Sequence, residues 1–192
     1  MPNNNVFNPL NLPVYTSNTN TYISPGIVAP PENNAGSTGN LYNAGSTNST
    51  TLGLLGGTVI ATVQLANPAG SGKTLHVSRL SGGITVALNL LSSFSGSMSL
   101  TANGTLSSPS TLTSVNSNLS SSNTSVAIVR FSAAPSGATP LMAMPLQAGP
   151  FLSNEFGRYV IPPGQAINLS VSGSLSVGGL MASTAYFAWW EV

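Results

Sequence analysis

The sequence predicts an all-β protein: a jelly-roll-like β-sandwich of about eight strands that follows an extended N-terminal arm. Two observations carry this prediction. From Leu52 onward, apolar and polar residues alternate with a period of two in short runs, and Gly, Pro, Asn and Ser separate the runs. No stretch shows the 3.6-residue period of an amphipathic helix. We therefore expect residues 1–50 to form the arm and a linker, and residues 51–192 to form the sandwich.

Eight segments are expected to form strands, and most of them show this alternation; 126–131 is a denser apolar run that we expect to be more buried. In the first of them, every odd-numbered residue from Val59 to Leu65 is apolar. Eight strands over about 140 residues suit a jelly roll, which has two sheets and eight strands in all. A Ser- and Asn-rich tract at 106–125 interrupts the series and predicts a long surface loop or an edge hairpin. The expected strands are 58–65, 74–80, 84–90, 97–102, 126–131, 159–161, 167–171 and 180–190.

The first 50 residues differ in composition from the rest. Prolines at positions 2, 9, 13, 25, 30 and 31 exclude a helix or a central strand. Short apolar groups recur between the prolines, which is untypical of a disordered tail. The run 33–51 is rich in Gly, Ser, Thr and Asn and predicts a flexible linker. We expect the apolar residues of the arm to contact neighbouring subunits; they are Val6, Phe7, Leu10, Leu12, Val14, Tyr15, Tyr22 and Ile23.

Charge is almost absent. Only 4% of the residues are charged, where about 25% is usual, and the net charge is +1. Such a chain has no cluster of Lys and Arg with which to bind nucleic acid or an anionic membrane. Weak charge also removes the repulsion that keeps proteins apart, so it favours self-association. A secreted monomer with a neutral, hydroxyl-rich surface is the alternative.

The sequence offers no catalytic constellation, and we expect no enzyme activity, no cofactor and no metal site. The chain has no Cys, no Asp and one His, so a zinc site and a Ser-His-Asp triad are excluded. The segment Gly70–Thr74 resembles the end of a phosphate-binding loop, but Asn67 replaces the first glycine and the residues that follow alternate as a strand. Glu155 and Arg158 can form a local ion pair.

The two ends of the chain bear on the location of the protein and on its contacts with neighbouring subunits. Residues 1–6 have neither the cationic nor the apolar region of a secretory signal, and no stretch approaches 20 apolar residues. We expect an extracellular or particle-surface protein made without a classical signal peptide. In the last strand, alternation places Phe187 and Trp189 on one face and Tyr186 and Trp190 on the other. One pair would fill the core and the other, with Trp190, would face a neighbouring subunit; a carbohydrate platform is the alternative.

Three segments resemble small jelly-roll surface proteins of spore-forming Firmicutes and of phage particles. They are Leu65–Leu75, Val160–Gln165 and the aromatic last strand. The nearest family is that of the endospore appendage (pilus-like fibre) subunits. This resemblance implies a jelly-roll core and an N-terminal arm that docks on neighbouring subunits. The cross-linked appendage fibres use Cys in or near the arm, whereas this chain has none, so a fibre here would hold by non-covalent contacts.

Two functions follow as expectations. The first is a structural subunit of a self-assembling fibre or particle surface, in which the arm adds as a strand to the edge of the next subunit. The second is a phage or spore-surface head domain that binds a receptor or a glycan. Electron microscopy separates them, because long fibres favour the first and discrete particles favour the second.

Overall fold

The computed structural model describes residues 31–87, 92–134 and 139–192, and the chain divides into two units, 1–30 and 31–192. The second unit contains the helix and all the strands that the structure describes. The eight arm residues expected to contact other subunits, from Val6 to Ile23, lie outside the described residues.

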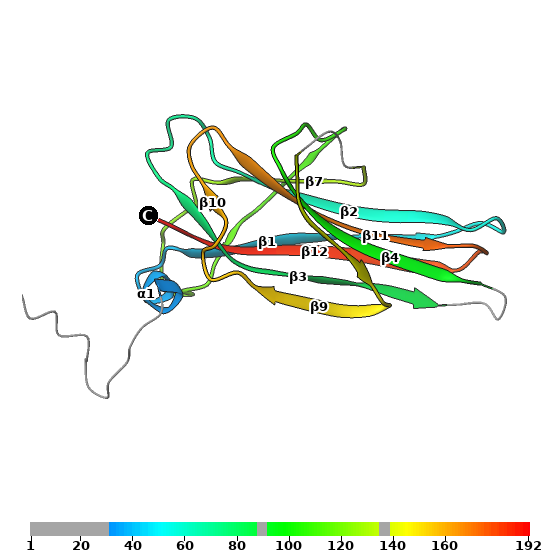
Figure 1. Ribbon diagram of the computed structural model, residues 1–192. Coiled ribbons are helices and arrows are strands. Elements are labelled where there is room, and N and C mark those ends of the chain that lie inside the picture. The colour runs from blue at the N-terminus through cyan, green and yellow to red at the C-terminus, as the bar shows by residue number, and fades with distance from the viewer. Residues whose placement is uncertain (1–30, 88–91, 135–138) are drawn as a thin grey trace, which may run out of the picture. The chain divides into compact units, whose positions relative to one another are not determined.

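Eight long strands form two antiparallel sheets that pack face to face (Figure 1). One sheet has the order β1 (Leu41–Thr51), β12 (Leu180–Glu191), β3 (Leu75–Ala87), β9 (Gly149–Asn154). The other has the order β2 (Gly57–Ala66), β11 (Ala166–Leu175), β4 (Phe94–Ala102), β8 (Thr139–Leu146). Consecutive long strands thus alternate between the sheets in most cases, which is the jelly-roll arrangement. The predicted fold class is confirmed.

Four short strands extend the edges of this frame. β7 (Ile128–Ser132) pairs with β2, and β5 (Ser110–Leu112) pairs with β7. β6 (Val115–Asn116) pairs with the start of β1, and β10 (Val160–Ile161) pairs with the start of β3. The Ser- and Asn-rich tract 106–125 contributes only β5 and β6, in agreement with the surface loop expected there.

The core lies between the sheets and confirms the alternation seen in the sequence. In β2, Val59, Val63 and Leu65 are at most 1% exposed. In β12, Phe187 and Trp189 point into the same core and are as deeply buried. Trp189 stacks on Tyr42 of β1, with ring centroids 6.0 Å apart. These large buried side chains from both sheets fix how the two layers pack.

The expected flexible linker at 33–51 is wrong. Residues Pro31–Ser37 form a short helix, α1, and Leu41–Thr51 form β1, which pairs with β12 along its full length. Proline is tolerated in the first turn of a helix, because the N–H groups there have no acceptor within the helix and the lack of one breaks no hydrogen bond. The Ser- and Thr-rich composition of β1 reflects its polar outer face, while Tyr42 and Ala44 on its inner face are buried.

Candidate interaction sites

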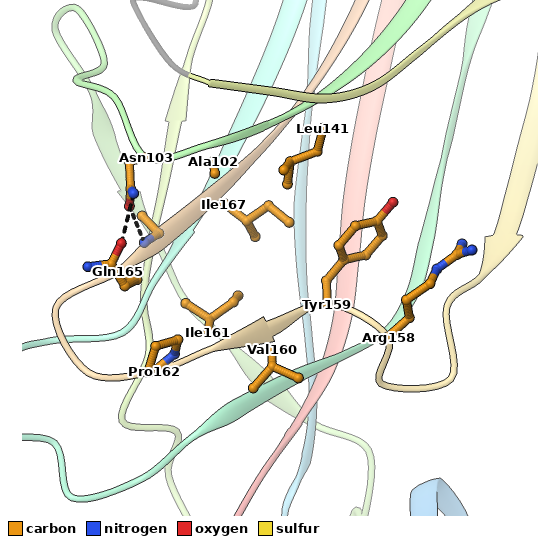
Figure 2. A pocket seen from close by; sticks show the side chains of 11 residues that line it. Ala102, Asn103, Leu141, Arg158, Tyr159, Val160, Ile161, Pro162, Gln165 and Ile167 are labelled. Atoms are coloured by element: carbon orange, nitrogen blue, oxygen red, sulfur yellow. Dashed lines mark hydrogen bonds between the residues drawn. The ribbon is translucent and has the colours of Figure 1, made fainter.

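An apolar groove opens between the two sheets at one edge of the sandwich (Figure 2). It has a volume of about 440 Å³ and lies between residues 158–162, which include β10, and the adjoining ends of β4, β8 and β11. Ile161 and Ile167 form its buried floor, each 3% exposed. Leu141 and Val160 line its rim and are about half exposed, at 45% and 53%. The groove therefore presents apolar surface that another chain can cover.

The two ends of the groove are polar. At one end, the Asn103 amide donates to Gln165 Oε1 at 2.8 Å, and the Ala166 N–H donates to Asn103 Oδ1 at 2.9 Å. At the other end, the Arg158 guanidinium lies over the Tyr159 ring, 5.4 Å from its centroid. Arg158 also pairs with Glu155, and this hydrogen bond and charge raise the pKa of the guanidinium. These contacts tie Asn103 to Gln165 at one end and Arg158 to Glu155 at the other.

A second site is the outer edge of β1. Beyond Asn43, where the pairing with β6 stops, residues 44–51 have no strand on their outer side among the residues that the structure describes. This stretch carries no Pro and no charged residue, and its register with β12 is continuous. Such an edge exposes a row of N–H and C=O groups that can pair with another strand.

The other edges of the described sandwich are less open. The outer side of β2 at 57–61, beyond its pairing with β7, also has no described strand beside it, but there the Val59 and Ile60 carbonyls already accept hydrogen bonds from Ser183 and Asn48. β8 contains Pro140 and Pro145 and an irregular register with β4, and β9 contains Pro150. Proline removes an N–H from the edge, and irregular pairing disrupts the ladder, so both features hinder strand addition. β5, β6 and β10 are only two or three residues long. The edge at 44–51 is thus the best template for another strand.

Exposed leucines mark the turn between β1 and β2. Leu54 and Leu55 are 85% and 93% exposed, in a turn closed by a hydrogen bond from the Gly56 N–H to the Gly53 carbonyl. Turns normally carry polar residues at such positions. Two adjacent leucines therefore add an apolar contact surface at this end of the sandwich.

Trp190 does not lie on a free surface, which corrects the expectation that it contacts a neighbouring subunit. It is 6% exposed, because the imidazole of His76 stacks on it and Gly157 packs against its indole ring. Tyr186, on the same face of β12, is 43% exposed. The aromatic residue of this face that remains accessible is therefore Tyr186. The alternation of the sequence placed Trp190 on the outer face but gave no sign of the loop that covers it.

The three carboxylates all hold loops or the short helix in place. Glu32 of α1 accepts a hydrogen bond from Ser78 at 2.6 Å. Glu155, with a fully buried side chain, accepts from Ser153 and Arg158. Glu191, also fully buried, accepts from Lys73 at 3.2 Å, from Ser125 and from the Val126 N–H. The expected ion pair between Glu155 and Arg158 does form, although its carboxylate is buried rather than exposed.

Within the described part of the chain, no three His, Cys, Asp or Glu residues gather as metal ligands, and no helix is long and apolar enough to cross a membrane. Neither the groove nor the open edge was foreseen. The groove joins Ala102, Leu141 and residues 158–167, which only the folded topology brings together. The edge lies in a segment whose composition is that of a linker.

Comparison with known proteins gives no relative: no family model, no curated protein and no solved structure matches this chain.

Proposed function

We propose that this chain is a structural subunit that assembles with copies of itself, on the outside of a cell, a spore or a particle, and that it has no catalytic activity. The observation that carries the proposal is the open edge of β1 at residues 44–51. Folded proteins normally protect long edges with Pro, Lys or bulges, because an unprotected edge recruits other strands. An edge without such protection suits a chain whose role is to recruit another strand.

The strand to be recruited is the N-terminal arm of a neighbouring subunit. Leu10, Leu12 and Val14 are two residues apart and would share one face of an extended chain. If the N–H groups of Leu10, Leu12 and Val14 face β1, the position of Pro13 faces outward, where an edge strand tolerates a residue without an N–H. Burial of each apolar side chain contributes roughly 1–2 kcal/mol, and the sum offsets the cost of ordering the arm.

The groove adds a second contact. β10 and β8, which flank the groove, lie at the edge of the sandwich opposite to β1. A subunit with different contact sites on opposite edges can bind two neighbours at once, and repetition of such a heterologous contact extends an assembly. The low charge of the chain supports this proposal, since little repulsion opposes close packing.

The absence of catalysis is part of the same proposal. Each carboxylate of the chain already binds a structural partner, and His76 is stacked on Trp190. A general acid or base needs a proton-transfer partner in a cleft, and these groups are committed elsewhere.

The experiment is deletion of residues 1–30, followed by electron microscopy and far-UV circular dichroism beside the full-length protein. We expect the truncated protein to keep its β-sheet spectrum and to lose its assemblies. Normal fibres from the truncated protein would show that the arm is not the connector. Loss of folding would place the arm in the core of its own subunit.

A full-length variant sharpens this test. Replacement of Leu10, Leu12 and Val14 by Ser removes the apolar face of the arm but keeps its length, and should weaken assembly nearly as much as the deletion. The matched control replaces three polar arm residues, Asn11, Thr16 and Asn18, by Ser, and should assemble normally.

A head domain that binds a receptor or a glycan is the second candidate function. One observation favours it: a hollow with amide side chains in its wall lies on the outer face of the second sheet, around Gln64 and Arg130. Negative-stain microscopy of the purified protein separates the two functions, because a head domain gives monomers or small discrete oligomers instead of fibres.

A further inference from the structure

The outer face of the second sheet carries a hollow that the assembly proposal leaves unused. After β4, residues 103–109 cross over β11 and β2 before the chain reaches β5. Two adjoining depressions of about 370 and 420 Å³ lie beside this crossing, and Gln64, Gly104 and Arg130 line both of them. We call this region the Arg130 hollow.

The floor of the Arg130 hollow is polar and rigid. Gln64 and Asn168 face outward from β2 and β11, yet they are 5% and 3% exposed because the crossing segment covers them. The Gln64 amide donates to Asn168 Oδ1 at 2.9 Å and to the Gly104 carbonyl at 3.1 Å. The Asn168 amide donates to the Asn103 carbonyl. Polar groups held in this way have a fixed orientation before any ligand arrives.

Arg130 stands above this floor without a counter-ion. The two ion pairs among the described residues join Lys73 to Glu191 and Arg158 to Glu155, so no carboxylate there pairs with Arg130. Within the described ranges, its half-buried side chain makes one long hydrogen bond, from Nη1 to Gln64 Oε1 at 3.4 Å. A guanidinium has five N–H donors arranged as a planar fork, which fits a carboxylate. Most of those donors are therefore available to a ligand.

Asn67, which also lines the larger depression, holds a buried acceptor. Asn67 is 2% exposed, and its amide N–H₂ donates to the Lys73 and Ile161 carbonyls at 2.8 and 2.9 Å. Its Oδ1 is buried and has no hydrogen-bond partner among the described residues. A buried acceptor of this kind costs free energy unless a small donor such as a water satisfies it, so it marks a local cost next to the hollow and not a contact for a sugar ring.

The rest of the wall is partly apolar. Ile128, 37% exposed, and Pro68 lie beside Arg130 in the larger depression, and the exposed Gln165 side chain lies at its rim. The hollow thus combines the Arg130 guanidinium, an exposed amide and a small apolar surface. A sugar ring has hydroxyl donors and an apolar C–H face, and a sugar acid adds the carboxylate that Arg130 lacks.

We propose that the Arg130 hollow binds a monosaccharide unit that carries a carboxylate, of the hexuronic or sialic acid class. The carboxylate pairs with the Arg130 guanidinium, a ring hydroxyl bonds to the exposed Gln165 amide at the rim, and the C–H face of the sugar covers Ile128. This site is independent of the arm, so it holds whether or not the chain assembles.

Saturation-transfer difference NMR on the full-length protein tests the proposal, with glucuronic acid and N-acetylneuraminic acid as probes and glucose as the neutral control. We expect transfer to one or both acids and little or none to glucose. Arg130→Gln should weaken the binding at least tenfold, and Arg130→Lys should restore only part of it, because a lysine has no fork. Arg79→Gln, which removes an exposed arginine from the other sheet, is the matched control and should bind as the parent does.

Equal binding of glucose and the acids, or equal loss in the Arg79 and Arg130 variants, overturns the proposal. So does the absence of transfer from both acids. If Arg130→Gln fails to fold, two other measurements replace it. One is binding of the acids by Gln165→Ala, a variant at the exposed rim, and the other is binding by the parent protein at increasing salt concentration. Binding that is unchanged in both measurements would also overturn the proposal. Oligosaccharides that end in the same acids then show whether the site takes a free sugar or the end of a glycan chain.

Discussion

The imidazole of His76 stacks on the indole of Trp190, with ring centroids 5.3 Å apart and ring planes 6° apart. The two residues face each other across β3 and β12. Gly157 covers another part of the same indole. A histidine and a loop glycine thus help to bury a tryptophan that lies on the outer face of its sheet.

Removal of the stack should expose Trp190. His76→Ala is expected to lower the free energy of unfolding by about 1 kcal/mol, since offset aromatic pairs contribute about that much beyond simple burial. It should also shift the tryptophan emission to longer wavelength. Urea unfolding and fluorescence measure the two effects. His76→Phe keeps a ring over the indole, so a red shift of the same size in that variant would contradict the account.

Gly157 is expected to be required for the stability of the fold, for two separable reasons. Its φ is +81°, which disfavours any residue with a Cβ, and a Cβ there would lie 2.5 Å from Trp190 Cη2. Gly164 has nearly the same φ, +83°, but no atom lies within 4 Å of its would-be Cβ. Gly164→Ala should therefore cost about 1 kcal/mol, and Gly157→Ala about 2–3 kcal/mol. Equal losses by thermal unfolding would show that the contact with Trp190 does not matter.

Lys73 neutralises a buried carboxylate. Its Nζ lies 3.2 Å from Glu191 Oε2, and the Glu191 side chain is fully buried while that of Lys73 is 35% exposed. Lys73→Met should destabilise the fold by about 1–2 kcal/mol, a value reduced by the solvent access of the lysine. In a Glu191→Gln background the same change should cost much less. A double-mutant cycle from urea unfolding measures this coupling, and additive effects would argue against the ion pair.

Tyr42 should make the fold sensitive to base. Burial raises the pKa of its phenol above the ordinary value of 10.0, and the nearby charge of Glu191 adds to the effect. The neutral phenol is therefore favoured in the folded state, and stability present below pH 10 is lost as the pH rises beyond it. Tyr42→Phe should lose less stability between pH 9 and pH 11 than the parent protein. Tyr186→Phe, on the exposed tyrosine, is the control and should follow the parent.

The fold and the core could be predicted from the sequence, because both depend on a local pattern. The period of two assigns Val59 to Leu65 to alternate faces whatever the rest of the chain does. The same rule places Phe187 and Trp189 on one face and Tyr186 and Trp190 on the other, but the structure is needed to show that the first pair fills the core. The individual strands were predicted less well: β3 is one strand where two were expected, and β1, β8 and β9 were not expected as strands.

The interaction sites could not be predicted in this way. β1 is Ser- and Thr-rich, so its sequence resembles a linker, and only its pairing with β12 makes it a strand. The Arg130 hollow depends on a loop that crosses the sheet between β4 and β5, and the groove depends on β8 and β10 meeting at one edge. These are contacts between segments that are distant in the sequence, and local periodicity carries no information about such contacts.

The open edge of β1 gives the most direct test of how the subunits join. Ser49 is an exposed residue in the unpaired stretch 44–51. A lysine there places a charge at the edge, which is how natural sheets prevent the addition of further strands. Ser49→Lys should leave the circular dichroism spectrum unchanged and reduce assembly, measured by light scattering and by fibre length in electron micrographs.

Ser97→Lys is the matched control: Ser97 is also exposed, but it lies on β4, which has a partner on both sides. Both variants add the same charge, so an equal loss of assembly would mean that charge alone is responsible. Normal assembly by Ser49→Lys, together with loss of assembly on deletion of residues 1–30, would move the docking site of the arm away from this edge and toward the groove.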